Sequence, residues 1–185
     1  MSKNPQAAAP VSEFAADAAA DPAPSSSTAQ ATADSRRIQV RRSSVHGKGV
    51  FALQPIAAGA PVIEYKGELI TWKQALKRHP HDPNDPTHTF YFHIDDKHVI
   101  DGKVGGNSSR WINHACEPNC EAEEDGSRVW IKALRNLYPG EELFFDYGLV
   151  IDARQTAKLK REYACRCGSP ICRGTMLAPK RRRAA

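Results

Sequence analysis

The chain has 185 residues, 41% of them hydrophobic, which is enough for one domain of ordinary size with a buried core. Its net charge of +5 comes from one end, because residues 151–185 carry ten basic and two acidic side chains, whereas residues 36–150 carry fifteen of each. No apolar run approaches the length of a transmembrane helix and no export signal is recognisable, so we expect an intracellular protein that does not act in a membrane.

The two ends of the chain have compositions typical of disorder. Residues 1–35 are mostly Ala, Ser, Thr, Pro, Gln and Asp, and they cannot bury enough apolar surface to offset the entropy lost on ordering. Residues 178–185 are basic and are also expected to be disordered. Such a basic tail favours solubility or weak contact with a polyanion over sequence-specific nucleic-acid binding.

Between these ends the sequence predicts short strands separated by turns rich in Gly and Pro. The expected strands are 37–41, 50–53, 62–65, 90–94, 98–101, 122–124, 128–134 and 142–147. Residues 71–78 have apolar side chains at helical spacing, and residues 153–163 are expected to form a second, basic helix. The sequence therefore predicts a mostly β domain with short helices.

All five cysteines lie after residue 115. An odd number of clustered cysteines, without an export signal, argues against a disulfide framework and favours metal ligation. Cys165, Cys167 and Cys172 form a C-x-C-x4-C pattern. A structural zinc (Zn) site needs four ligands, so Cys116 or Cys120 has to supply the fourth.

Four further segments are informative, although each has an ordinary structural explanation. They are His46-Gly-Lys-Gly-Val-Phe-Ala, Glu64-Tyr-Lys-Gly-Glu, Arg110-Trp-Ile-Asn-His-Ala-Cys-Glu-Pro-Asn-Cys and Gly140-Glu-Glu-Leu-Phe-Phe-Asp-Tyr-Gly. The first can be a plain turn or a place where the backbone approaches a ligand closely. His114 can be a core histidine, and Tyr147 can be an aromatic residue at a strand end whose hydroxyl reaches water.

Taken in order, these segments resemble the SET domain of protein-lysine methyltransferases followed by a post-SET zinc segment. The resemblance covers about residues 36–177 and implies a SET domain at 36–150, a basic helical connector at 151–160 and a post-SET zinc segment at 161–177. The implied SET fold consists of small curved sheets around a knot-like core, which would bring the segments of Asn113 and Tyr147 together.

The resemblance also implies an activity and a set of site residues. The activity is the transfer of methyl groups from S-adenosyl-L-methionine to a lysine ε-amine of a basic, histone-like protein. Tyr147 would be the catalytic tyrosine and Tyr65 a second tyrosine of the lysine channel, and Phe145 at the product-controlling position favours di- or trimethylation. The implied cofactor contacts are His46, Lys48, Gly49, Val50, Phe90, Asn113, His114 and Arg166. The implied zinc ligands are Cys116, Cys165, Cys167 and Cys172.

Some features leave alternatives open. Trp111 and Ala115 depart from the pattern of the family, where Phe or Tyr and a small hydroxyl residue are usual. The acidic residues that follow residue 116 form either a solvated hairpin or a surface that attracts a basic peptide. A SET-like module that binds a peptide without methyl transfer, and a zinc-dependent nucleic-acid binder, are the rival functions. We expect a location at chromatin in the nucleus if the source is eukaryotic, and in the cytoplasm if it is bacterial.

Overall fold

The computed structural model describes residues 37–78, 90–126, 128–151 and 153–179. The segment predicted to be disordered at 1–35, and all but the first two residues of the basic tail at 178–185, lie outside the described residues. None of the helices within the described ranges has the length and apolar character needed to cross a membrane.

Short strands dominate the described part of the chain. Their bounds, with those of the helices, are β1 (Ile38–Arg42), β2 (Lys48–Ala52), β3 (Pro61–Glu64), β4 (Glu68–Thr71), α1 (Trp72–Arg78), β5 (Tyr91–His93), β6 (His98–Asp101), the 3-10 helix η2 (Ser108–Trp111), β7 (Asn113–His114), β8 (Cys120–Asp125), β9 (Arg128–Ala133), β10 (Phe144–Phe145) and α2 (Ala157–Glu162). This confirms the mostly β architecture with short helices.

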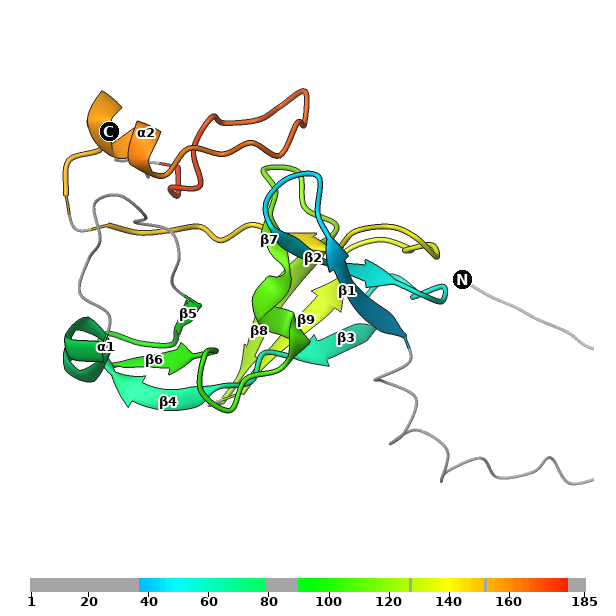
Figure 1. The fold of residues 1–185 in the computed structure, drawn as a ribbon, viewed down its shortest axis with the longest axis horizontal. Coiled ribbons are helices and arrows are strands. Elements are labelled where there is room, and N and C mark those ends of the chain that lie inside the picture. The colour runs from blue at the N-terminus through cyan, green and yellow to red at the C-terminus, as the bar shows by residue number, and fades with distance from the viewer. Residues whose placement is uncertain (1–36, 79–89, 127, 152, 180–185) are drawn as a thin grey trace, which may run out of the picture.

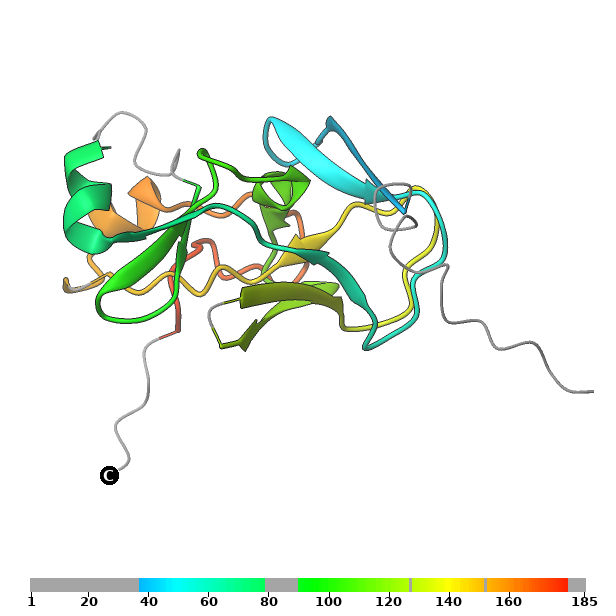
Figure 2. The same ribbon diagram turned by 90° about the horizontal axis from the view of Figure 1, so that it is seen from below.

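The strands form four small sheets. Three are antiparallel, with the orders β1–β2, β3–β9–β8 and β4–β6–β5, and the fourth is the parallel pair β7–β10. In Figure 1 the β4–β6–β5 sheet and α1 lie at one end of the molecule, β1 and β2 lie at the other, and β7, β8 and β9 lie between them. Figure 2 shows the same separation of the two ends from a second direction.

The buried apolar residues of these sheets form one large cluster and two small ones, the small ones centred on Tyr65, Ile100 and Val129 and on Ile70, Ala75 and Val99. Strand β9 alternates between outward and inward residues, and its inward residues Val129, Ile131 and Ala133 are fully or almost fully buried. Leu143 and Leu137 are completely buried in the large cluster. Because burying one such aliphatic side chain stabilises a fold by about 1.5–3 kcal/mol, this core fixes the position of the strands that frame the site.

The parallel pair β7–β10 connects two of the informative motifs. Asn113 lies opposite Phe144 and His114 lies opposite Phe145. Asn119 fastens the pair from the side, because its Nδ2 donates to Glu142 O at 2.8 Å and its Oδ1 accepts from Phe144 N at 2.8 Å. The expected proximity of the Asn113 and Tyr147 segments is therefore confirmed, while a knot-like threading of the chain stays a prediction.

Two predicted elements are shorter than expected. The strand predicted at 142–147 is reduced to β10. The preceding residues pair with β2, since Ala52 N donates to Glu141 O and Leu143 N donates to Val50 O, and only Phe144 and Phe145 pair with β7. The helix predicted at 153–163 is reduced to α2, which begins where the Thr156 hydroxyl accepts from Leu159 N. Strands β4 and β7 were not predicted, since segments of two to four residues have no clear periodicity.

Candidate functional site

Two tyrosines, the buried Tyr65 and the partly buried Tyr147, come together at the centre of the fold with their hydroxyl groups removed from solvent. The Tyr147 hydroxyl donates to Ile112 O at 2.8 Å, and the Tyr65 hydroxyl donates to Phe90 O at 3.0 Å. Burial raises the pKa of Tyr147 well above its ordinary value, and burial followed by the proximity of Tyr147 and Asp101 does the same for Tyr65. Both phenols therefore stay protonated at neutral pH, with their protons engaged and their oxygen lone pairs free to accept.

A pocket of about 380 Å³ opens beside Tyr147. It is lined by Phe92, Phe145 and Tyr147 together with Pro118, Cys120, Glu121, Ala122, Leu134 and Asp146. The ring of Phe145 lies 4.8 Å from that of Tyr147 and 6.3 Å from that of Phe92, and the Phe92 ring lies 5.2 Å from that of Tyr65. The rings of Phe92 and Phe145 thus connect the two tyrosines in a row of four aromatic side chains.

Asn113 holds the loop that contains the first motif. Its Nδ2 lies 3.2 Å from His46 O, 2.9 Å from Lys48 O and 3.0 Å from Glu142 Oε1. The other carboxylate oxygen of Glu142 accepts from the Ser43 hydroxyl at 3.1 Å. Because Glu142 touches both Asn113 and the start of this loop, it sets the position of the loop relative to β7.

Gly49 is required where Glu142 crosses the loop. A Cβ atom added to Gly49 would overlap the Glu142 carboxylate. The next residue, Val50, is fully buried in the apolar core, and its carbonyl oxygen accepts from Leu143 N at 2.7 Å. The space beside the second glycine of the Gly-x-Gly motif is therefore filled by a carboxylate of the protein itself.

Beside this loop lies a second cluster, built from aromatic rings and cations. The rings of Phe90 and Trp111 meet edge to face with centroids 4.9 Å apart. Lys48 Nζ lies 4.6 Å from the centre of the Trp111 ring, and the Arg110 guanidinium lies 5.1 Å from it. Arg110 Nε is buried and has no hydrogen-bond partner among the described residues. The cluster offers stacking surfaces, positive charge and an unused donor.

Three of the predicted cofactor contacts, His46, Lys48 and Arg166, are exposed residues. His46 lies on the surface of the loop held by Asn113, which contacts its carbonyl oxygen. Arg166 is exposed between two of the cysteines. The structure thus brings His46, Lys48, Gly49, Phe90 and Asn113 to one side of the tyrosine pair, but no contact of the Arg166 side chain connects it to them within the described ranges.

Four cysteines converge from distant parts of the chain. The sulfur atoms of Cys116, Cys165, Cys167 and Cys172 all lie within 4.8 Å of one another, while Cys120 is buried elsewhere in the core. Cys116 Sγ lies 3.7 Å from Cys165 Sγ and 3.9 Å from Cys172 Sγ. A tetrahedron of thiolates about 2.3 Å from a zinc ion has edges of about 3.8 Å, so the donor set and its spacing fit zinc. These distances are too long for disulfides, and the structure brings together the four cysteines that the resemblance implies as zinc ligands.

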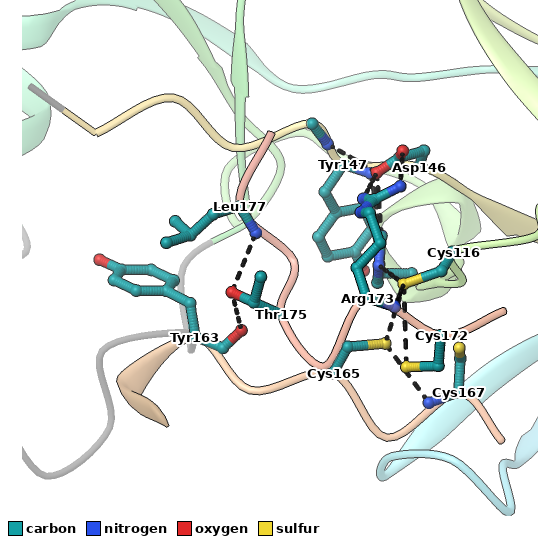
Figure 3. A network of polar contacts seen from close by, with 12 residues as sticks. Cys116, Asp146, Tyr147, Tyr163, Cys165, Cys167, Cys172, Arg173, Thr175 and Leu177 are labelled. Carbon is teal, nitrogen blue, oxygen red and sulfur yellow. Dashed lines mark hydrogen bonds and ion pairs between the residues drawn. The ribbon is translucent and has the colours of Figure 1, made fainter. Parts of the chain in front are cut away.

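Backbone amides also point at these sulfur atoms. Arg173 N donates to Cys116 Sγ at 3.3 Å, Gly174 N to Cys172 Sγ at 3.4 Å and Cys167 N to Cys165 Sγ at 3.4 Å. Such N–H···S contacts stabilise thiolate charge, as partners around the ligands of a metal commonly do. Figure 3 shows the four side chains gathered below the segment that carries Asp146 and Tyr147.

His114 lies between the cysteines and Tyr147. Its Nδ1 is 3.1 Å from Tyr147 N, and its Nε2 is 3.5 Å from Cys116 Sγ. A backbone N–H only donates, so Nδ1 accepts and the ring proton belongs on Nε2, where it points to the sulfur. Burial lowers the pKa of His114, which is consistent with this neutral tautomer. The side chain of His114 therefore connects the cysteine cluster to the backbone of Tyr147.

Three residues of the site were missed from the sequence. In the sequence, Glu142 is one of two adjacent acidic residues in the segment that begins at Gly140, and Arg173 is one of ten basic residues after residue 150. Asp146 joins them, because Arg173 Nη1 and Nη2 donate to its two carboxylate oxygens at 2.7 and 2.8 Å. Burial opposes ionisation of Asp146, yet hydrogen bonds from Arg173 and from Gly148 N hold its pKa below the ordinary value.

Comparison with known proteins gives a consistent family. Residues 47–148 match the family model described as the SET domain. The chain is 37% identical over 140 residues to "Histone-lysine N-methyltransferase trithorax" of Drosophila virilis, covering 74% of the chain and 4% of that protein. It is 36% identical over 150 residues to "Histone-lysine N-methyltransferase, H3 lysine-4 specific" of Kluyveromyces lactis, covering 78% of the chain and 15% of that protein.

A solved structure shares the fold. It is described as "ctPRC2 in an autoinhibited conformation bound to S-adenosylmethionine", and it superposes with a TM-score of 0.56 at 31% identity over 61% of this chain and 15% of its own. The chain thus spans only a small fraction of the length of the relatives that it matches, 4% of the first and 15% of the second.

Proposed function

This chain belongs to the SET domain family, and from that premise we propose that it is a protein-lysine N-methyltransferase. It transfers methyl groups from S-adenosyl-L-methionine to the ε-amine of a lysine in a basic, histone-like protein. The observation that carries the proposal is the pair of protonated tyrosines, of which Tyr147 lines the pocket and Tyr65 packs against the pocket residue Phe92. The relatives are named for histone-lysine methyl transfer, which supports the same activity and the same class of substrate.

The pocket suits the side chain of lysine. Its walls are formed largely by Phe92, Phe145, Tyr147 and other apolar residues, which pack against a hydrocarbon stem. Neutral amine is required for attack, and removing the proton of a lysine with a pKa of about 10.4 at neutral pH costs on the order of 4 kcal/mol. Contact of the amine with the apolar part of this lining would lower this cost, because removal from water disfavours the charged form.

Tyr147 and Tyr65 orient the amine and leave its deprotonation to solvent. Each hydroxyl already donates its proton to a backbone carbonyl, so each oxygen has lone pairs that accept from an N–H group. With their pKa values raised by burial, neither phenol ionises near neutral pH to act as a base. Their contribution is alignment of the nitrogen, which is a large part of the acceleration of a two-reactant displacement.

The cluster around Trp111 is the proposed site of the methyl donor. Aromatic faces at Phe90 and Trp111 suit an adenine ring, and Lys48 and Arg110 suit a carboxylate. When bound, S-adenosylmethionine supplies a methyl group on a sulfonium, whose C–S bond breaks as the C–N bond to lysine forms. Asn113 holds the loop from His46 to Lys48 in place on this side, and His46, Gly49, Val50, His114 and Arg166 remain proposed contacts.

Phe145 is the proposed control on the number of methyl groups. Its ring lies against Tyr147 and Phe92 and carries no hydroxyl. A tyrosine here would add a polar group to the pocket and reduce the space for a methylated amine. We therefore infer di- or trimethylation, and Phe145→Tyr is expected to shift the product toward monomethyl-lysine in mass spectrometry. An unchanged product distribution would contradict this role.

Zinc at the four cysteines would fasten the C-terminal segment to the main domain. Cys116 follows β7, whereas the other three ligands lie after α2, so the metal would cross-link segments about 50 residues apart. The role is structural because all four coordination positions are taken by protein sulfur, which leaves no open position for a substrate.

Charge supports a basic substrate. Exposed acidic residues extend along the edge strand β8 next to the pocket: Glu121, Glu123, Glu124 and Asp125. Reversing the charge of Glu121 and Glu124 is expected to raise the KM for a basic peptide and to weaken its dependence on salt. An unchanged KM would leave these residues as a solvated hairpin. We place the activity at chromatin in the nucleus if the source is eukaryotic, and in the cytoplasm if it is bacterial.

Weak contact with a polyanion through the basic C-terminal residues is a further part of the proposal. The ten basic side chains of residues 151–185 support it. It predicts that DNA retention falls steeply with salt and shows no base preference. A base preference would instead favour a nucleic-acid binder.

The experiment that tests the proposal uses the zinc-loaded protein, methyl-labelled S-adenosylmethionine and a panel of basic proteins that includes core histones. We expect label on lysine, located by tandem mass spectrometry, and cofactor binding by calorimetry. Cofactor binding without transfer to any protein of the panel would favour a peptide-binding module. A folded, zinc-loaded protein that binds no cofactor would contradict the proposed function.

A further inference from the structure

We propose that Arg173 is a positioning residue for Tyr147, which transmits the attachment of the cysteine-rich segment to the tyrosine pocket. This inference rests on the proposed methyl transfer and adds to it a residue that touches neither lysine nor cofactor. It arises from the position of Arg173, directly after Cys172, where one residue contacts both a cysteine ligand and the neighbour of the tyrosine.

Arg173 makes two kinds of contact in opposite directions. Its backbone N donates to Cys116 Sγ at 3.3 Å, which attaches the residue to the cysteine cluster. Its guanidinium forms a bidentate pair with Asp146, with donor–acceptor distances of 2.7 and 2.8 Å. Figure 3 shows the side chain extending from the cysteines to Asp146, beside the ring of Tyr147. Bidentate arginine–carboxylate pairs fix orientation as well as distance.

Asp146 uses the same carboxylate to shape the backbone at Tyr147. Its Oδ1 accepts from Gly148 N at 3.0 Å, two residues further along the chain, and lies 3.4 Å from His114 Nδ1. That nitrogen accepts from Tyr147 N at 3.1 Å. The backbone on both sides of Tyr147 is therefore held by Asp146 and His114, and both of these side chains lead back to the cysteine cluster.

The chain beyond Arg173 continues this attachment. Leu149 N donates to Met176 O at 3.2 Å, and Ala178 N donates to Leu149 O at 2.9 Å. Leu177 is 1% exposed, so its side chain anchors this segment in the fold. The segment after the cysteines thus runs alongside the segment after Tyr147, and the Arg173–Asp146 pair lies at the end nearest the pocket.

A solvent-exposed ion pair of this type would contribute little, but this one is partly enclosed. The side chains of Arg173 and Asp146 are 26% and 33% exposed, and Arg173 Nε is buried without a partner among the described residues. The net stability gained from a partly enclosed pair of this kind is small, so its main effect is on the geometry of the two side chains. Because Nη1 and Nη2 each bond a different oxygen of Asp146, the pair fixes the orientation of this carboxylate as well as its distance.

The test compares Arg173→Met with Arg173→Lys. Methionine keeps much of the length and apolar stem without charge, whereas lysine keeps the charge but makes a single hydrogen bond. We expect Arg173→Met to retain its zinc and to bind cofactor within about threefold of the original affinity. The kcat of Arg173→Met, calculated per cofactor-binding site, should fall at least about tenfold, and its KM should change less. Arg173→Lys should show a smaller decrease in kcat. Arg135→Met, which removes an exposed arginine–carboxylate pair with Glu141, is the matched control.

A spectroscopic measurement separates positioning from general stability. In protein labelled with 3-fluorotyrosine, the 19F resonance of Tyr147 is identified by its absence in Tyr147→Phe. Arg173→Met should shift or broaden this resonance and leave that of Tyr138 unchanged. An unchanged Tyr147 resonance together with an unchanged kcat per site would overturn the proposal. If Arg173→Met does not fold, Arg173→Lys carries the same test, with a smaller 19F change expected and no change contradicting the role.

The two proposals fail in different ways. A shifted Tyr147 resonance in a protein that methylates nothing would overturn the proposed function and leave the structural connection standing. Full activity in the original protein with no effect of Arg173→Met would overturn the connection alone.

Discussion

The two sides of the candidate site are stabilised by different kinds of interaction. The side that contains β7 and β10 rests on a continuous apolar core, in which Ile112 and Leu143 are buried to 1% exposure or less. The side that contains the C-terminal segment has one short helix, α2, without a buried residue. It is held by four cysteines, the Arg173–Asp146 pair, the buried side chain of Leu177 and a few backbone hydrogen bonds to Leu149.

This difference shows how the site depends on its surroundings. A wall built on an apolar core keeps its shape as long as the domain is folded, because the burial that forms it is distributed over many residues. A wall held by a few specific contacts is able to detach while the domain remains folded. The pocket therefore depends on the domain fold, whereas the cysteine segment reaches it only through the contacts of Arg173 with Asp146 and of His114 with Tyr147.

Removing the metal should have the largest effect and should separate the two sides. After chelation, or in Cys116→Ser, we expect methyl transfer to fall by on the order of 100-fold or more, since zinc binding contributes directly to the order of such segments. Hydrogen exchange should accelerate in residues 163–178 and stay slow in β9. Cys120→Ala is the matched control, because this cysteine lies outside the cluster, and it should keep its zinc. Equal acceleration in both regions would show a single cooperative unit.

A cavity in the apolar core should destabilise the whole domain. Leu143→Ala removes a completely buried side chain, so the free energy of unfolding should decrease by about 2–5 kcal/mol, measured by urea denaturation. Leu177→Ala removes an equally buried side chain on the other side. It should accelerate hydrogen exchange locally and change the global midpoint less. A larger decrease of the unfolding midpoint in Leu177→Ala than in Leu143→Ala would contradict this distinction between the apolar core and the C-terminal segment.

Loss of the Glu142 anchor should weaken cofactor binding. Glu142→Gln leaves one oxygen to serve both Ser43 and Asn113, and a lost hydrogen bond to a charged group is worth about 1.5–3 kcal/mol. The Kd for S-adenosylmethionine, measured by calorimetry, should rise about tenfold. Glu141→Gln, at the neighbouring position, removes a contact to Arg135 and should change this Kd little. Equal effects of the two changes would show that Glu142 has no special role.

Alkaline pH should reveal the two buried tyrosines through a smaller effect. Their pKa values in the folded protein are raised above the 10.0 of an ordinary tyrosine, so the unfolded chain loses these protons first. The free energy of unfolding should therefore decrease as pH rises above 10, by up to about 1.4 kcal/mol per pH unit for each tyrosine. Tyr147→Phe should reduce this slope, because it removes one of the two raised pKa values. An unchanged slope in Tyr147→Phe would contradict the burial of its hydroxyl as a neutral group.

Much of this arrangement was predictable from the sequence where short motifs carry strong local constraints. The order of the four motifs predicted the family, and the spacing of Cys165, Cys167 and Cys172 predicted a metal site. The adjacent strands β5 and β6 were predicted, at 90–94 and 98–101, from their apolar residues and from the turn residues between them. Each of these signals lies within a short stretch of the chain, so it can be recognised from one sequence without knowledge of the fold.

The connections between motifs were not predictable in the same way. Glu142 contacts Asn113 and Ser43 across separations of 29 and 99 residues, and in the sequence it is one of two adjacent acids in a turn. Arg173 is one of ten basic residues after residue 150, and nothing in its neighbourhood distinguishes a pair with Asp146 from a solvated charge. Long-range polar contacts depend on the finished fold and leave no periodic pattern.

The measurement that tests the central claim most directly is single-turnover methyl transfer by Tyr147→Phe, compared with Tyr138→Phe and the unchanged protein. All three should bind zinc and S-adenosylmethionine equally. We predict that Tyr147→Phe loses on the order of 100-fold or more in rate, because the amine loses the oxygen that orients it, while Tyr138→Phe keeps the original rate. A Tyr147→Phe protein that transfers methyl groups at the original rate would contradict the account of the site.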